Sequence, residues 1–79
     1  MSAPMINLDS KNILNKPIVT NDGYLRGHIV GQTDKELVLI EGTWRLRKYH
    51  IPKSLVTNFD GSYIYLSIPD REMEKYRVK

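Results

Sequence analysis

The apolar residues of this chain of 79 residues occur in short runs, which turn residues separate from one another. In the run Ser62–Ile68, isoleucine and leucine at every second position alternate with tyrosine and serine. A period of two places successive side chains on opposite faces of a β-strand. The pattern therefore predicts a strand with its isoleucines and leucine inward and with Tyr63 and Tyr65 outward. Asp60-Gly61, just before it, predicts a hairpin turn.

Two segments nearer the N-terminus are also predicted to be strands, Pro17–Thr20 and Tyr24–Gln32. They are joined by Asn21-Asp22-Gly23, which favours a tight turn because Asn and Asp bond their own backbone and Gly accepts a positive φ. Gly27 and Gly31 fall on the apolar face of the longer segment. Glycines at such positions indicate a sharp bend or a close backbone approach, as at the corners of small barrels.

Two more strands are predicted in the middle of the chain. Leu37–Ile40 is an unbroken apolar run, which is typical of a strand covered on both faces but also of a short buried helix. Thr43–Ile51 alternates again, with Trp44 and Leu46 on one face. If the charged face of this strand is solvated, Trp44 and Leu46 are core residues. Pro52 ends the strand, because proline donates no hydrogen bond to a ladder.

The two ends of the chain are predicted to differ from its middle. After residue 69, acidic residues come early and basic residues late, and Met73 and Tyr76 share a face, which favours a short helix. A helix this short is marginal in water unless it docks on the rest of the protein. The predicted organisation is an extended or poorly ordered lead-in over residues 1–12, a β-domain over 13–68 and a helical tail over 69–79. The closely spaced strands favour a small β-barrel.

Composition and motifs exclude most catalytic chemistry. The chain has no cysteine, and its two histidines, His28 and His50, lack the spacing of metal ligands. Neither a nucleophile elbow nor a glycine-rich phosphate loop is present. We therefore predict a protein that is not an enzyme and that uses no catalytic residue, metal, cofactor or small-molecule substrate. Since no apolar run approaches the roughly 20 residues of a membrane span and no secretory signal is visible, we expect a soluble cytoplasmic protein with no membrane partner.

The net charge of +3 is concentrated in one segment of the chain. Residues 41–53 carry four basic residues against Glu41 alone, whereas the segments 1–40 and 54–79 are each balanced. Basic residues interleaved with aromatic residues suit nucleic acid, because cations replace the counterions of phosphates and aromatic rings stack on bases. The candidate binding residues of this segment are Arg45, Arg47, Lys48, Tyr49 and Lys53.

On a strand, Arg45, Arg47 and Tyr49 share one face, with about 6.6–7 Å between successive side chains, a spacing that resembles the distance between phosphates. Arg26 and His28 extend this row of side chains if their strand neighbours the strand 43–51. Two other interpretations of the row are open. In the first, the row is the solvated face of an edge strand, where charge discourages aggregation. In the second, the row binds an acidic protein surface.

Tyr63 and Tyr65 form a second candidate surface, since outward aromatic residues two positions apart stack on a base or anchor a protein contact. The alternative is that the C-terminal tail covers them through Met73 and Tyr76. The sequence leaves both interpretations open.

The order of these motifs resembles the PRC-barrel superfamily, and within it a small archaeal and bacterial branch of unassigned function. The resemblance spans residues 13–68 and is carried, in order, by Ile13–Val19, the Asn-Asp-Gly turn, Leu25–Ile29, Tyr49–Val56 and Asp60–Leu66. Asn15 stands where the family often has glycine, and asparagine is the next best residue for a left-handed backbone. The resemblance implies a mainly β fold, a small, partly open six-stranded β-barrel with a short C-terminal helix or tail.

The resemblance also implies a non-enzymatic adaptor, and it carries over no catalytic residue. Relatives in the superfamily bind protein partners on ribosomal particles, RNA-processing machinery, photosynthetic complexes and archaeal cell-division assemblies. Together with the basic segment, this predicts an adaptor for a larger ribonucleoprotein, with a ribosomal particle or its RNA as the partner. The alternatives are a DNA-binding protein of chromatin type and a protein–protein scaffold that self-associates through a barrel edge, because one fold serves many functions.

Overall fold

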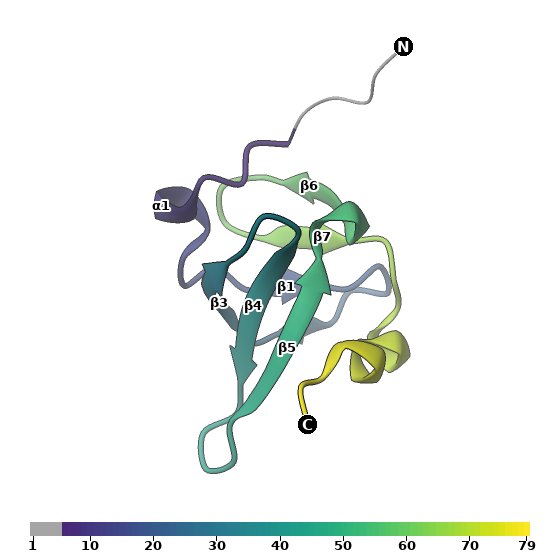
Figure 1. Ribbon diagram of the computed structural model, residues 1–79. Helices are drawn as coiled ribbons and strands as arrows, with labels where there is room; N and C mark the ends of the chain where they lie inside the picture. The colour runs from purple at the N-terminus through teal and green to yellow at the C-terminus, as the bar shows by residue number, and fades with distance from the viewer. Residues whose placement is uncertain (1–5) are drawn as a thin grey trace.

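The structure is a computed structural model that describes residues 6–79 and consists mainly of β-strands (Figure 1). The elements in chain order are α1 (Ser10–Ile13), β1 (Ile18–Val19), β2 (Leu25–Arg26), β3 (His28–Gln32), β4 (Glu36–Glu41), β5 (Arg47–Pro52), the 3-10 helix η1 (Lys53–Leu55), β6 (Val56–Phe59), β7 (Ile64–Leu66) and the 3-10 helix η2 (Asp70–Tyr76). One sheet has the strand order β2-β1-β7-β6 and the other the order β3-β4-β5. Neighbouring strands are antiparallel except β1 and β7, which are parallel.

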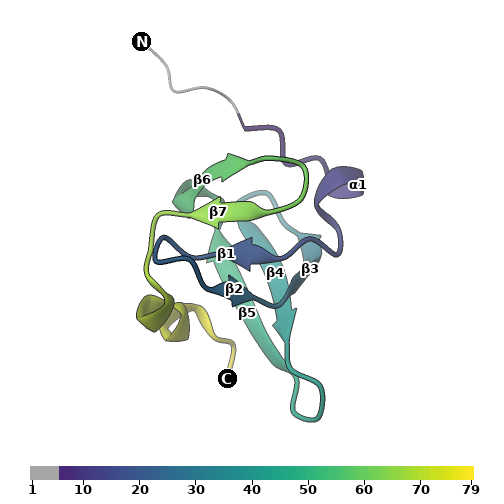
Figure 2. The same ribbon diagram turned by 180° about the vertical axis from the view of Figure 1, so that it is seen from behind.

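The two sheets lie one over the other with their strands crossing, as the opposite views in Figures 1 and 2 show. The prediction of a mainly β fold is confirmed. The predicted barrel is not, because the described strands belong to two separate sheets and neither sheet closes on itself. Within residues 6–79, no helix has the length and apolar character that crossing a membrane requires.

The expected turn and the expected bend are both present in the N-terminal half. Asn21-Asp22-Gly23 joins β1 to β2. Gly27, directly after β2, has a φ of 46°, and a Cβ at this position would collide with the backbone carbonyl of Ile40. The strand that the alternation predicts over 24–32 is therefore interrupted at Gly27, which passes the chain from one sheet to the other. Asn15 is also left-handed, with a φ of 67°, as its place in the motif implies.

One core of apolar side chains lies between the sheets. Its buried members are Ile13, Ile18, Ile29, Leu37, Leu39, Tyr49, Ile51, Val56, Ile64, Leu66, Ile68 and Met73. The inward positions of β7 are those that its alternation predicts, and the run in β4 is a strand rather than a helix.

Segments at both ends of the chain complete the core. Met73 of η2 is fully buried, so the tail docks, as a helix of its length requires. Beyond η2, the Val78 N–H donates to the carbonyl of Lys48 at 2.7 Å, which holds the tail against the edge of β5. At the other end, α1 begins inside the predicted lead-in, and the Asp9 side chain caps it by accepting from the N–H of Lys11. Residues 1–5 of the lead-in lie outside the described residues.

The prediction for Thr43–Ile51 is wrong about which face of the strand is buried. The strand β5 begins only at Arg47. Trp44 and Leu46, which are core residues under the alternative of a solvated charged face, are 97% and 66% exposed. Tyr49, predicted to face outward, is fully buried. The physical reason is that the first residues of this segment belong to a hairpin loop, in which the backbone does not alternate. The alternation of side chains starts again at the pair Glu41 and Arg47, where β4 and β5 first lie opposite each other.

Candidate functional site

The loop between β4 and β5 projects beyond the body of the molecule (Figures 1 and 2). We call residues 42–48, which are the loop together with the first two residues of β5, the hairpin tip. The pair Glu41 and Arg47 closes the loop itself, and Gly42 has a φ of 107°. A Cβ on Gly42 would lie 2.5 Å from the carbonyl oxygen of Arg45, so the loop folds back tightly on itself and requires glycine here.

The hairpin tip carries two large apolar side chains that lie mostly or almost entirely outside the packed structure. Trp44 is 97% exposed and Leu46 is 66% exposed. Tryptophan ordinarily buries much of a surface of about 150–250 Å², and an exposed large apolar group is informative where an exposed leucine alone is not. Such a side chain at the end of a projecting loop is typical of a contact with a partner.

The cations of the basic segment fall into three different environments. Arg45 and Lys48 are exposed at the hairpin tip, and no carboxylate of residues 6–79 lies within ion-pair distance of either. Arg47 instead donates to Glu41 at 3.1 Å. Lys53 follows the other end of β5, about 17 Å from Lys48 at the ordinary rise of a strand. Arg45 and Lys48 therefore lie on the hairpin tip with Trp44, whereas Lys53 follows the opposite end of β5.

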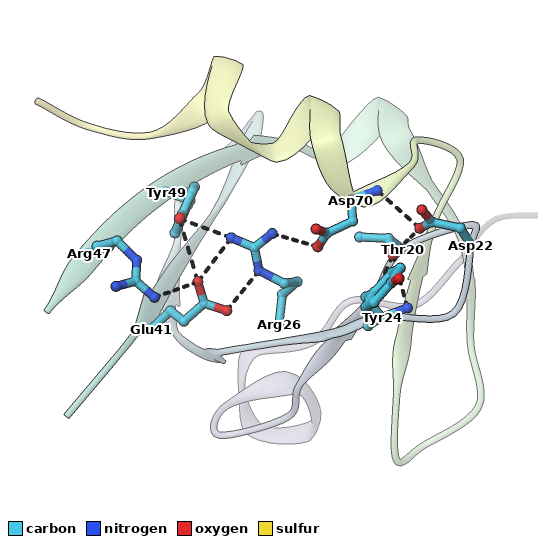
Figure 3. Close-up of polar contacts among 8 residues, drawn as sticks. All are labelled: Thr20, Asp22, Tyr24, Arg26, Glu41, Arg47, Tyr49 and Asp70. Atoms are coloured by element: carbon cyan, nitrogen blue, oxygen red, sulfur yellow. Dashed lines mark hydrogen bonds and ion pairs between the residues drawn. The ribbon is translucent and has the colours of Figure 1, made fainter.

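The condition under which Arg26 and His28 extend the basic row is not met. Arg26 lies in β2, in the other sheet, and β4 lies between β5 and the strand β3 that holds His28. The Arg26 guanidinium is half-buried and donates twice to Glu41, from Nε at 2.7 Å and from Nη2 at 2.9 Å (Figure 3). Its Nη1 donates to Asp70 at 2.6 Å, and its Nη2 also donates to the Tyr49 hydroxyl at 3.0 Å. Its positive charge is thus neutralised by two carboxylates.

The Arg26 cluster, comprising Arg26, Glu41, Arg47, Tyr49 and Asp70, ties the base of the hairpin tip to the other sheet and to η2 (Figure 3). The hydrogen bond from Arg26 holds the pKa of the Glu41 carboxyl below its ordinary value, and Arg47 adds to this effect. The same bond raises the pKa of Arg26. Both groups therefore stay charged at neutral pH, and the cluster is a structural anchor of the hairpin rather than a free binding surface.

A second polar contact secures the start of η2. The Asp70 N–H donates to the Asp22 carboxylate at 3.0 Å, and the Thr20 hydroxyl donates to the same oxygen at 2.6 Å (Figure 3). The bond from Thr20 is the main cause that lowers the pKa of Asp22. The Tyr24 N–H in turn donates to Thr20, so the turn between β1 and β2 is closed against the tail.

The other predicted site residues lie away from the hairpin tip. Tyr65 lies in β7, which belongs to the other sheet, and Tyr63 directly precedes this strand. In Figures 1 and 2, β7 lies away from the loop between β4 and β5. Tyr63 is exposed, and the ring centres of the two tyrosines are 6.3 Å apart. The Tyr65 hydroxyl donates to Asp60 at 2.8 Å, which raises the pKa of Tyr65. His28 is exposed on β3, and across residues 6–79 no cluster of three or more His, Cys, Asp or Glu is able to hold a metal ion.

The sequence pattern does not reveal that Trp44 and Leu46 are exposed, because the alternation does not continue through a loop. The charge excess of residues 41–53 indicates the segment that holds the candidate site. The Glu41-Gly42 pair was the one local sign of a turn, since glycine after a strand favours positive φ.

No family model matches this chain, and no curated protein or solved structure matches it either. The resemblance to the PRC-barrel superfamily therefore stays a prediction.

Proposed function

We propose that this chain is a non-enzymatic adaptor that binds the RNA of a larger ribonucleoprotein, such as a ribosomal particle, through the hairpin tip. The observation that carries the proposal is the combination of an exposed tryptophan and Arg45 on the projecting loop with Lys48 at the start of β5, two cations that have no ion-pair partner among residues 6–79. Arg45 and Lys48 have no carboxylate partner among the described residues, and Trp44 is not packed.

In this proposal, the surroundings of each side chain determine its role in binding RNA. Phosphates bind to Arg45 and Lys48 and displace counterions, which supplies affinity that falls as salt rises. Trp44 adds a contact to a base, since every base has a face on which an indole stacks. The two sheets and the Arg26 cluster serve as the rigid support, because Glu41 and Arg47 hold the base of the tip by an ion pair at 3.1 Å.

The proposal is tested by sedimentation of native lysate on a sucrose gradient, with the tagged chain located in the fractions. We expect the chain to migrate with a ribosomal subunit at moderate salt and to return to the top of the gradient after RNase treatment. We also expect Arg45→Gln with Lys48→Gln to release it, and to lower the dependence of log K on log salt by about 1.4, as two lost contacts to single-stranded RNA predict.

A matched control is available in the same sheet. Lys35→Gln with Lys53→Gln removes the same number of charges at the opposite end of β4 and β5, where the Lys53 N–H donates to the carbonyl of Lys35 at 2.8 Å. This control is expected to migrate as the unmodified chain does. Equal loss in both double variants would show a general charge effect, and unchanged migration of the Arg45 and Lys48 variant would overturn the proposal.

A further inference from the structure

Resting on the proposed function, we infer that the hairpin tip selects unpaired bases of single-stranded RNA over double-helical RNA, with Trp44 as the stacking platform. The first observation is the state of the indole. At 97% exposure, nearly all of its surface is open to a planar partner, and no side chain has to move before a base stacks on it.

The second observation is that the backbone of the loop that carries Trp44 is fixed, although the indole itself is free of contacts. The strand pair ends at Glu41 and Arg47, which are also joined by an ion pair at 3.1 Å. Gly42 folds the loop so tightly that its backbone lies against the carbonyl of Arg45. A loop whose backbone is already positioned loses less freedom on binding, so each contact contributes more of its energy to affinity.

The third observation concerns which form of RNA such a tip reaches. In a double helix the bases are already stacked on one another, the major groove is too deep and narrow for side chains to read, and the minor groove is shallow. Proteins that bind the double helix instead span about 16 base pairs with many phosphate contacts. The hairpin tip offers only two cations without an ion-pair partner in the described part of the chain, Arg45 on the loop and Lys48 at the start of β5. Without stacking, two phosphate contacts yield only weak, salt-sensitive binding.

The test uses the single tryptophan of the chain as its own reporter. The probes are single-stranded RNAs of about 12 nucleotides and the double helix formed from the same strands, a length within the usual range of single-strand sites. We expect the single strands to quench Trp44 fluorescence and to bind at least about 10-fold more tightly than the double helix. Trp44→Ala is expected to weaken single-strand binding by about 5- to 150-fold, as loss of one stacked base predicts, and Trp44→Phe by less.

The outcomes separate this inference from the proposed function. Equal affinity for the two forms of RNA, or a Trp44→Ala variant that binds single strands unchanged, overturns the inference and leaves the adaptor proposal standing. Absence of binding to either form at low salt overturns both. A shift of Trp44 emission to shorter wavelength with vesicles of anionic phospholipid, without quenching by RNA, also overturns both, since the tip then enters a lipid surface. Because Trp44 lies outside the core, all variants are expected to keep the far-ultraviolet circular dichroism of the unmodified chain.

Discussion

The substitution Glu41→Gln removes the charge that holds the Arg26 cluster together while keeping the shape of the side chain. The Glu41 side chain is 16% exposed and accepts from Arg26 at 2.7 and 2.9 Å and from Arg47 at 3.1 Å. A glutamine retains one acceptor oxygen and turns an amide N–H₂ toward the guanidinium donors. The substitution therefore leaves Arg26 half-buried, with Asp70 as its remaining charged partner.

The free energy of unfolding lost in Glu41→Gln is expected to lie between the values for exposed and for buried ion pairs. An exposed pair contributes about 0–1 kcal/mol, and breaking a fully buried pair costs about 3–5 kcal/mol. Hydrogen bonds to charged groups contribute about 1.5–3 kcal/mol each. For a site that is mostly but not fully shielded, we expect the free energy of unfolding at neutral pH to fall by about 2–3 kcal/mol. In a domain of this size that corresponds to a lowering of Tm by about 10–20 °C.

The pKa shift of Glu41 also predicts in which direction the stability difference changes with pH. Hydrogen bonding to Arg26 lowers the pKa of Glu41 in the folded state below its ordinary value of 4.5. The unfolded state then binds more protons in acid, so the stability that Glu41 contributes is complete above its unfolded pKa and is lost as the pH falls through the folded pKa. The stability difference between the unmodified chain and Glu41→Gln is therefore constant near neutral pH and shrinks in acid.

Urea denaturation followed by far-ultraviolet circular dichroism measures this difference. Trp44 fluorescence is a poor probe of unfolding, because the indole is already 97% exposed in the folded chain. Glu74→Gln is the matched control, since the Glu74 side chain is 65% exposed and lies 3.9 Å from Arg77. The control is expected to change stability by less than about 0.5 kcal/mol. If Glu41→Gln costs no more than Glu74→Gln, or if the difference grows in acid, the Arg26 cluster is not the anchor described above.

Two further stability predictions follow from the packing. Gly27→Ala is expected to cost at least about 3 kcal/mol in urea denaturation or to prevent folding, because its Cβ meets the Ile40 carbonyl at a positive φ, whereas Gly31→Ala, which meets open space, is expected to stay within about 0.5 kcal/mol. Equal stability of the two alanine variants would contradict this account of the bend. Met73→Ala is expected to lower the free energy of unfolding by about 2–5 kcal/mol, since the side chain is fully buried and leaves a cavity, and a near-neutral result would show that η2 does not depend on this contact.

Local patterns in the sequence determined a large part of this fold. The alternation in Ser62–Ile68 identifies the buried face of β7, and Asn21-Asp22-Gly23 marks the turn between β1 and β2. Gly27 marks the bend, and the acidic-to-basic tail forms a helix, of 3-10 type. These features are predictable because each depends on backbone preferences within a few residues.

Only the tertiary structure decided which residues of the hairpin are buried and which partners its charged side chains have. Trp44 is exposed and Tyr49 buried because a loop restarts the alternation of side chains, and the point of restart depends on where β4 and β5 pair. Arg26 meets Glu41 and Asp70 because a bend and two sheets bring three distant segments together. Strand neighbours and the closure of a sheet are long-range properties, on which the periodicity of a single strand carries no information. The sequence by itself therefore located the basic segment, and the fold decided which of its cations remain free.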